Sequence, residues 1–371
     1  MNGGNGTLAP SYAIAEYLNQ IGNQTKVFDI MAEANPMGEM LCNVYNFLLK
    51  KSLLSASIYM EFAHAFPIDK LSLFNKLGSK NSEMIINKEQ PDAILLICPW
   101  ISRMTLLATE ACNNNDRIRP MVFVDVVDLG YGMTTSWVNN DVDFTFLSTT
   151  NAYNYLTTEG LNENQAEVLG VPLSNEFAGG KINAIEKRKA RAKFVLNNDD
   201  LVITILGGRE GGIYTEKILI RLMKDLPYCR FMVQCGLNQT LFSRINKIAY
   251  NNKNVHALGF VKSMRELYAT SDIVITKPGA ITVSELIVSK VPFIINAWPA
   301  VMPQERGNVE FVTENTLGCV AHSVQELPKL VRDNMDCKYV ESLNNEIREK
   351  LYGTKKIGDK IVSLIKEHRL D

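Results

Sequence analysis

Short apolar runs alternate with helical patterns along almost the whole chain. The runs, rich in β-branched and aromatic residues, predict strands, and the 3.6-residue periodicity between them predicts helices. The predicted strands are Lys26–Ile30, Ala93–Ile97, Met121–Val124 and Phe144–Leu147 in the first half, and Leu201–Leu206, Phe231–Gln234, His256–Leu258, Ile273–Ile275 and Phe293–Ile295 in the second. Because strands that alternate with helices form parallel sheets, the pattern predicts an α/β protein.

A polar stretch separates the two sets of strands. Residues 174–198 contain Gly179, Gly180 and the charged run EKRKARAKF, and at 371 residues the chain is too long for one compact core. We therefore expect a first domain over residues 1–173, a second over 174–351 and a terminal helix over 352–371.

Charge is uneven although the net charge is only −1. Residues 1–165 hold 10 basic and 17 acidic side chains, and the remainder holds 29 and 23. A basic second half suits a domain that binds a diphosphate. It lacks the basic–aromatic pattern of nucleic-acid modules, so nucleic acid is not an expected partner.

Cysteine and histidine usage bears on metals and location. The seven cysteines form no CxxC pair and there are only four histidines, so we expect reduced thiols in a cytoplasmic protein and no metal site. No apolar run approaches the roughly 20 residues needed to span a bilayer, and no signal peptide opens the chain.

Residues 276–309 carry the most specific chemistry. The turn at Gly279 links a strand to a helix whose free backbone N–H groups and dipole suit an anion. Thr282 and Glu285 follow in that helix, where a carboxylate suits a ribose diol; alone they would indicate an ordinary capping box. The residues after the next strand suit sugar hydroxyls: Gln304, Glu305 and Asn308. Phosphate, diol and sugar contacts in this order predict a nucleotide-sugar site.

Together these residues resemble the donor site of glycosyltransferases with the GT-B fold, in which two Rossmann-like domains face each other with parallel sheets across a cleft. They look most like the monogalactosyldiacylglycerol synthases and the bacterial processive diacylglycerol glucosyltransferases, and more distantly like the peptidoglycan GlcNAc transferase. The resemblance runs from Gly3 to about Ala321. It implies that the terminal helix returns to pack on the first domain.

Three further segments of the second half carry the resemblance. The glycine-rich loop of Gly207, Gly208 and Arg209 is implied to lie near the donor diphosphate. Residues 234–238 resemble a CGRN-like turn of the family. Phe260 and Val261 resemble a GFV segment whose backbone pairs with uracil. Each alone is compatible with ordinary loop chemistry, but their shared order is not easily explained that way.

The start of the chain departs from the family. Residues 1–7 form a glycine loop with Gly4 and Gly6, and Ala9–Leu18 a helix, but the strand that should precede the loop is missing. Either a start codon lies upstream or the sheet has one strand fewer. Thr7 stands where the family has a histidine, a candidate base; threonine cannot act as a base near neutral pH, and capping the next helix is the simpler role.

Two other segments of the first half resemble the family. The sequence VDVVD followed by Trp137 resembles its TD motif, and Asp128 follows a strand end, where open α/β sheets bind ligands. Asp128 is therefore our candidate base, although a turn or helix-capping aspartate is equally compatible; Asp125, inside the strand pattern, is less attractive.

Asn43–Pro67 resembles the family region that faces the membrane and the lipid acceptor. Alone, it predicts one amphipathic helix for which core packing is the default. Its apolar residues are Leu48, Leu49, Leu53, Leu54 and Tyr59, and only Lys50 and Lys51 supply basic charge. Peripheral membrane contact therefore rests mainly on the resemblance.

The sequence and the resemblance together predict an inverting hexosyltransferase that moves a hexose from a UDP-sugar to a lipid, with diacylglycerol as the leading acceptor. No metal or other cofactor is expected, because helix N-termini and Arg209 stabilise the leaving diphosphate. We expect a cytoplasmic protein, peripheral on the cytoplasmic face of the membrane. Two alternatives stay open: a UDP-sugar epimerase of the same fold, and a non-catalytic or partner-dependent nucleotide-sugar-binding protein.

Overall fold

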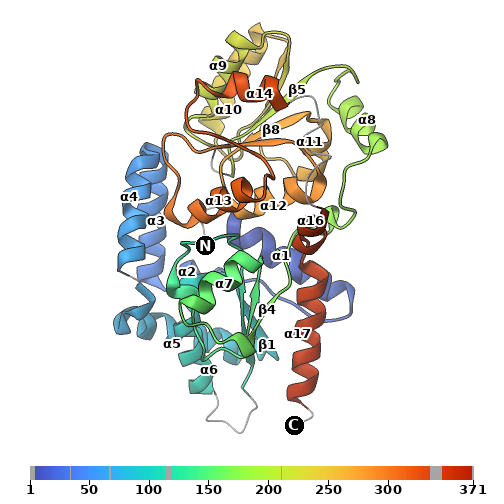
Figure 1. Cartoon of the computed structure of the whole chain (residues 1–371). Coiled ribbons are helices and arrows are strands. Elements are labelled where there is room, and N and C mark those ends of the chain that lie inside the picture. Colours follow the sequence, from blue (N-terminus) through green and yellow to red (C-terminus); the bar gives the residue numbers. More distant parts are fainter. Residues whose placement is uncertain are drawn as a thin grey trace. The chain divides into compact units, whose positions relative to one another are not determined.

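The computed structural model describes residues 5–33, 35–66, 68–112, 119–209, 211–334 and 345–369. The internal contacts divide the chain into two units (Figure 1). Unit 1 comprises residues 1–175, 302–307 and 350–371, and unit 2 comprises residues 176–301 and 308–349. Each unit contains one parallel sheet with helices on it, which confirms the predicted α/β class.

Unit 1 is built on a four-stranded sheet in the order β1-β2-β3-β4. Its strands are β1 (Ala93–Leu96), β2 (Met121–Val126), β3 (Phe144–Leu147) and β4 (Ala166–Val168). Alternate residues of β2 belong to different apolar clusters, Val122 and Val124 to one and Met121 and Phe123 to the other. A parallel sheet covered on both faces requires this pattern.

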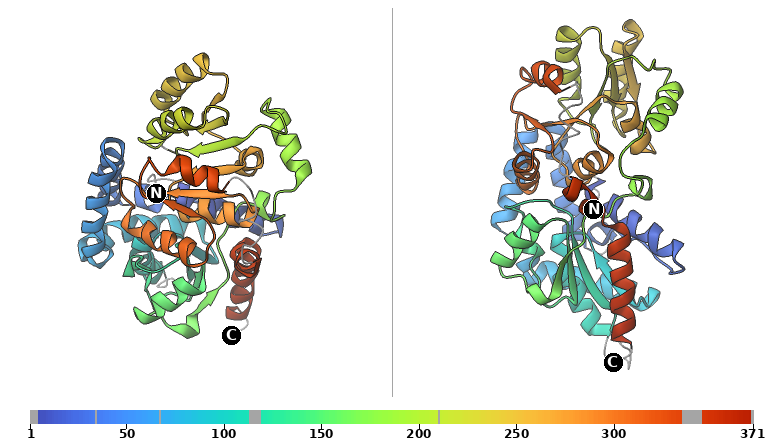
Figure 2. Two further views of the ribbon diagram at one scale, coloured as in Figure 1. Left: turned by 45° about the horizontal axis from the view of Figure 1, so that its top comes forward. Right: turned by 45° about the vertical axis from the view of Figure 1, so that its right-hand side comes forward.

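The helices of unit 1 cover both faces of this sheet. Their bounds are α1 (Asn5–Gln20), α2 (Ile30–Glu33), α3 (Pro36–Lys51), α4 (Leu53–Ala65), α5 (Ser72–Glu89), α6 (Ser102–Cys112), α7 (Thr150–Thr158) and α17 (Thr354–His368). Helices α1 and α17 lie side by side, and Ile14 and Ile357 join Phe123 in one cluster (Figure 2). The Tyr17 hydroxyl donates to Asp359 at 2.5 Å, so the terminal helix is fixed within unit 1.

Unit 2 is built on a six-stranded parallel sheet in the order β10-β9-β8-β5-β6-β7. Its strands are β5 (Val202–Leu206), β6 (Arg230–Gln234), β7 (Val255–Leu258), β8 (Ile273–Thr276), β9 (Phe293–Asn296) and β10 (Cys319–Ala321). The chain builds outward from β5 to β7, returns to place β8 beside β5, and builds outward again. The strand order therefore reverses between β5 and β8, and open α/β sheets bind ligands at the carboxyl ends of strands at such a switch point.

The helices of unit 2 lie on both sides of this sheet. Their bounds are α8 (Ala184–Lys193), α9 (Thr215–Asp225), α10 (Gln239–Asn251), α11 (Met264–Thr270), α12 (Ala280–Ser289), α13 (Arg306–Glu314), α14 (Leu327–Asn334) and α16 (Asn345–Leu351). The first two residues of α13 and the last two of α16 belong to unit 1. Leu219 of α9 and Ile245 of α10 pack with Ile203 and Phe231. Leu267 of α11 packs with Val202 in a separate cluster.

Eight of the nine predicted strands are confirmed, and the ninth, Lys26–Ile30, is wrong. Residues 23–29 contain no strand, and Ile30 begins α2. The segment has the apolar alternation of a strand but pairs with no neighbour among the described residues, and a strand exists only through its ladder. Two real strands, β4 and β10, were not predicted.

The single helix predicted over residues 43–67 is also wrong. The segment contains two helices, the end of α3 and all of α4, and Ser52 between them is extended at φ −160° and ψ 125°. Ser52 ends α3 and starts α4, because its hydroxyl accepts from the backbone N–H of Ser55 at 3.4 Å. Leu48 and Tyr59 pack on the core of unit 1, whereas Leu54 is exposed.

Candidate functional site

The glycine loop after β5 lies at the switch point of unit 2. Strand β5 pairs directly with β8, so the loop that follows β5 neighbours the 277–279 turn that follows β8. Gly208 adopts φ +71°, and a Cβ built on it would lie 4.0 Å from Cε of Lys277. The loop thus presents bare backbone with a lysine side chain beside it, a combination that suits a phosphate.

The turn after β6 holds this loop in place. Gly236 has φ +60°, and a Cβ there would come within 2.2 Å of the Arg209 carbonyl oxygen. The Leu237 N–H donates to that same oxygen at 2.7 Å. The backbone of Arg209 is therefore fixed by a neighbouring loop that only glycine allows to approach this closely. The residues Gly207, Gly208 and Arg209, predicted from the sequence, all lie at this edge of the sheet.

Helix α12 begins at the same edge without a side-chain cap. Gly279 is its N-cap, and as a glycine it supplies no side-chain hydrogen bond to the helix start. The capping-box interpretation of Thr282 and Glu285 is therefore wrong, because neither residue stands at the cap. The first N–H groups of α12 are left for an anion. Asn308 is fully buried, and its amide donates to the Pro278 carbonyl at 2.9 Å, which braces this turn.

Glu285 is buried between α11 and α12. Its side chain is only 8% exposed, and its Oε2 accepts a hydrogen bond from the Tyr268 hydroxyl at 2.8 Å. Burial raises the pKa of Glu285 to about 8, and the Tyr268 hydrogen bond opposes that rise. The Thr282 side chain also hydrogen-bonds the Tyr268 hydroxyl. A carboxyl removed from water with one oxygen committed suits a ligand that brings its own hydroxyls.

Phe260 and Val261 follow β7 on the way to α11. Phe260 is exposed, whereas Val261 packs with Leu258 and Leu267 in the cluster below α11. The backbone of this segment is therefore anchored on one side. Its predicted contact with a uracil ring stays a prediction.

Asp128 lies just beyond the end of β2 in unit 1. Its Oδ2 accepts from Nε1 of Trp137 at 3.3 Å, and its carbonyl accepts from the Ser148 hydroxyl. The short 3₁₀ helix that follows, Thr135–Trp137, is capped by Thr134 and not by Asp128. Asp125, in contrast, is fully buried inside β2, its carboxyl has no hydrogen-bond partner among the described residues, and burial raises its pKa. Of the two, Asp128 keeps the candidate role.

The segment with Gln304 and Glu305 belongs to unit 1, although Asn308 belongs to unit 2. Gln304 and Glu305 lie in the 3₁₀ helix η7 (Pro303–Glu305). A Cβ on Gly130 would come within 2.1 Å of the Gly307 carbonyl oxygen, so the two backbones are in direct contact. This contact places the segment against the loop that carries Asp128. Oε1 of Gln304 is buried without a hydrogen-bond partner among the described residues, which leaves an acceptor for a ligand hydroxyl.

The predicted N-terminal glycine loop differs from the structure. Gly6 and Thr7 lie within α1, and the Thr7 carbonyl accepts from the Ser11 hydroxyl at 2.8 Å, while Gly4 lies outside the described residues. Glycine and proline suggested a loop, but Pro10 is tolerated inside α1, since it removes only one hydrogen bond near the helix start. Thr7 is thus neither a loop residue nor the cap of the following helix.

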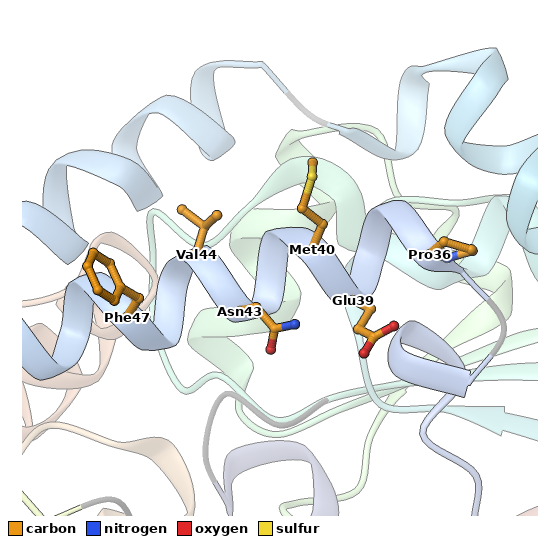
Figure 3. Close-up of a pocket in the computed structure, with 6 residues that line it drawn as sticks. All are labelled: Pro36, Glu39, Met40, Asn43, Val44 and Phe47. Atoms are coloured by element: carbon orange, nitrogen blue, oxygen red, sulfur yellow. The ribbon is translucent and has the colours of Figure 1, made fainter.

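A shallow groove of about 530 Å³ runs along α3. Figure 3 shows Met40, Val44 and Phe47 along one side of the helix, with Glu39 and Asn43 on the neighbouring side. These three apolar side chains are exposed, and so are three on α4: Leu54, Ile58 and Phe62. Each helix therefore presents an apolar stripe to the outside of unit 1, more than scattered surface residues would give.

Two contributors to these sites were not predicted. Lys277 was part of the motif but was not proposed as a ligand-binding residue, and Tyr268 carried no recognisable signal. No cluster of three or more acidic, histidine or cysteine side chains that could hold a metal ion occurs in the part of the chain that the structure describes. Within the same residues, no helix is both long and apolar enough to cross a bilayer.

Comparison with known proteins adds family matches for both halves. Residues 10–173 match the monogalactosyldiacylglycerol (MGDG) synthase family, and residues 202–356 match the glycosyltransferase family 28 C-terminal domain. Among curated proteins, the processive diacylglycerol beta-glucosyltransferase of Bacillus licheniformis is 25% identical, over 88% of this chain and 82% of its own. The probable chloroplastic monogalactosyldiacylglycerol synthase of Glycine max is 25% identical, over 89% of this chain and 63% of its own.

The solved structures support the fold. MurG of Acinetobacter baumannii superposes with a TM-score of 0.62 at 16% identity, covering 97% of this chain and 96% of that one. The predicted GT-B fold and the predicted resemblance are both confirmed.

Proposed function

We propose that this chain, a glycosyltransferase with the GT-B fold that resembles the MGDG synthases, transfers a hexose from a UDP-sugar to a lipid hydroxyl, with diacylglycerol as the acceptor. The observation that carries the donor assignment is Glu285, a buried carboxyl on a helix whose N-terminus has no side-chain cap, at the switch point of unit 2. An anion site and a diol site on one helix match a nucleoside diphosphate.

The donor then binds in three parts. The diphosphate meets the first N–H groups of α12, with Lys277 and Arg209 supplying positive charge. The ribose diol donates to Glu285, and the uracil edge meets the backbone at Phe260. Because charge builds on the diphosphate as it leaves, these fixed donors stabilise the transition state, and no metal ion is required in this mechanism.

In unit 1, Asp128 acts as the base. It takes the proton of the acceptor hydroxyl as that oxygen attacks the anomeric carbon, the bond from that carbon to the diphosphate oxygen breaks, and UDP leaves with the electron pair. Attack opposite the leaving group inverts the anomeric configuration. Trp137 holds the Asp128 carboxylate through its indole N–H, and Gln304 and Glu305 receive the sugar hydroxyls.

The lipid approaches through the exposed apolar stripes of α3 and α4. Helices α3 and α4 carry Glu39, Glu61, Lys50 and Lys51, whose formal charges cancel, and Glu61 pairs with Arg306. Attachment therefore rests on insertion of apolar side chains, not on attraction to anionic lipid. We infer a peripheral enzyme on the cytoplasmic face of a membrane, and the six described cysteines, all free thiols, suit a reducing compartment.

Incubation with radiolabelled UDP-glucose or UDP-galactose and a total lipid extract tests this proposal. Label in a chloroform-soluble product that grows with added diacylglycerol is the expected result. An epimerised UDP-sugar formed without acceptor would instead identify the epimerase alternative. Binding of UDP without turnover of either sugar on any lipid would identify a non-catalytic or partner-dependent protein.

A further inference from the structure

Tyr268 is fully buried. It lies on α11, which packs beside α12, the helix that carries Glu285. Its ring packs against Phe177, with ring centroids 6.1 Å apart, and its hydroxyl donates to Glu285 at 2.8 Å. Phenylalanine would fill the same space, so packing alone does not require the hydroxyl. A buried phenol needs an acceptor and a buried carboxylate needs a donor, and each supplies the other here.

The electrostatics make Tyr268 a permanent donor. Burial and the neighbouring Glu285 raise the pKa of Tyr268 well above its ordinary value, so the phenol stays protonated. Its proton therefore always points to an acceptor, and the Thr282 side chain hydrogen-bonds the phenol as well. One oxygen of Glu285 is held by this contact, and the other has no hydrogen bond to a described residue.

We propose that Tyr268 is a positioning residue of the ribose site, which holds Oε2 of Glu285 so that the carboxylate presents its remaining acceptor positions to the two hydroxyls of a nucleoside diol. This inference rests on the proposed function, because it takes Glu285 as the diol ligand. It adds that diol recognition depends on a residue that never touches the nucleotide.

A consequence is that diol recognition depends on pH. Burial raises the pKa of Glu285 to about 8, so near pH 7 only about a tenth of it is ionised. Two hydroxyls donate to an ionised carboxylate, and binding the diol therefore favours loss of the proton. The titratable groups that act on Glu285 are Tyr268, whose hydrogen bond lowers its pKa, and Glu176, whose charge raises it. Glu176 in turn accepts from the Ser263 hydroxyl at 2.6 Å.

The test compares UDP with 2′,3′-dideoxy-UDP by calorimetry between pH 6 and pH 9. The two ligands share the same phosphates, so the ratio of their affinities isolates the diol. For the unaltered protein the ratio should rise about tenfold between pH 7 and pH 9, following the ionised fraction of Glu285. In Tyr268→Phe the ratio at pH 8 should fall several-fold and the midpoint should move to higher pH, because the contact that favours ionisation is gone. Tyr228→Phe, at an exposed tyrosine before β6, is the matched control and should follow the unaltered profile.

The outcomes separate this inference from the proposed function. A Tyr268→Phe protein that melts cooperatively but keeps the unaltered pH profile overturns the positioning role, provided that Glu285→Gln abolishes the preference for the diol. If Glu285→Gln keeps that preference, Glu285 is not the diol ligand, and the ribose assignment fails together with the role of Tyr268. A merely structural role for Tyr268 would lower the melting temperature without moving the midpoint of the affinity ratio.

Discussion

Replacing Glu285 by glutamine tests the donor site most directly. The change keeps the size of the side chain and one oxygen acceptor but removes the charge. Hydrogen bonds to a charged group contribute about 1.5–3 kcal/mol, so at pH 9, where Glu285 is mostly ionised, UDP affinity should fall about 10- to 150-fold. At pH 7 the unaltered protein has about a tenth of Glu285 ionised. The ratio of UDP affinities between the unaltered protein and Glu285→Gln should therefore be close to tenfold smaller at pH 7 than at pH 9.

The same substitution has an opposite effect on stability, which provides an internal control. The folded-state pKa of Glu285 is raised from 4.5 to about 8, so the folded protein binds more protons than the unfolded chain between these values. Stability from the neutral carboxyl is complete below pH 4.5 and is lost as pH rises through 8, by at most about 1.4 kcal/mol per pH unit. Glu285→Gln lacks this loss and should melt no lower than the unaltered protein at pH 8.

Calorimetric titration with UDP and thermal melts at pH 6 and pH 8 measure both effects. Weaker UDP binding by a protein that is at least as stable at pH 8 is the expected combination. Unchanged UDP affinity at pH 9 would show that Glu285 serves only the packing between α11 and α12, and the donor assignment in unit 2 would then be refuted.

Three further predictions concern unit 1. Asp128→Asn should lower kcat about 10²- to 10⁴-fold with little change in donor KM, as removal of a general base does; full activity would remove Asp128 from the mechanism. Gln304→Ala or Glu305→Ala should lower turnover and leave UDP affinity nearly intact in calorimetry, and equal loss of UDP binding would contradict their assignment to the sugar. The double variant Phe47→Ser/Phe62→Ser should no longer float with neutral phosphatidylcholine vesicles that contain diacylglycerol, whereas salt should leave flotation of the unaltered protein unchanged; salt-sensitive flotation would show that charge, not apolar insertion, holds the protein.

The fold could be predicted wherever a local pattern determined it. Eight strands follow apolar runs that are long enough to show, whereas β4 and β10 are only three residues each and too short for any periodicity. The apolar pattern continues across Ser52, so periodicity alone merged α3 and α4 into one helix. The serine that separates them acts through a hydrogen bond to its own backbone neighbourhood, which composition does not reveal.

The candidate site could likewise be predicted only where its residues lie close together in the sequence. Gly279, Thr282 and Glu285 lie on one continuous element, so their spacing alone could suggest a ligand. Tyr268 reaches Glu285 only because α11 packs beside α12, and its position in the sequence carries no trace of that contact. The contact of Gly307 with Gly130 is likewise invisible in the sequence. Gln304 and Glu305 therefore belong to unit 1, although the sequence grouped them with Asn308, which belongs to unit 2.

This division of residues separates binding from turnover. The groups assigned to the nucleotide, Glu285 and the start of α12, are braced by contacts within unit 2, such as those of Tyr268 and Asn308. Asp128 and the segment with Gln304 are braced by contacts within unit 1. Since each set is fixed inside its own unit, substitutions in unit 2 should change the affinity for UDP, and substitutions in unit 1 should change kcat. A variant of Gln304 that weakened UDP as strongly as Glu285→Gln does would break this separation, because the nucleotide would then depend on side chains from both units.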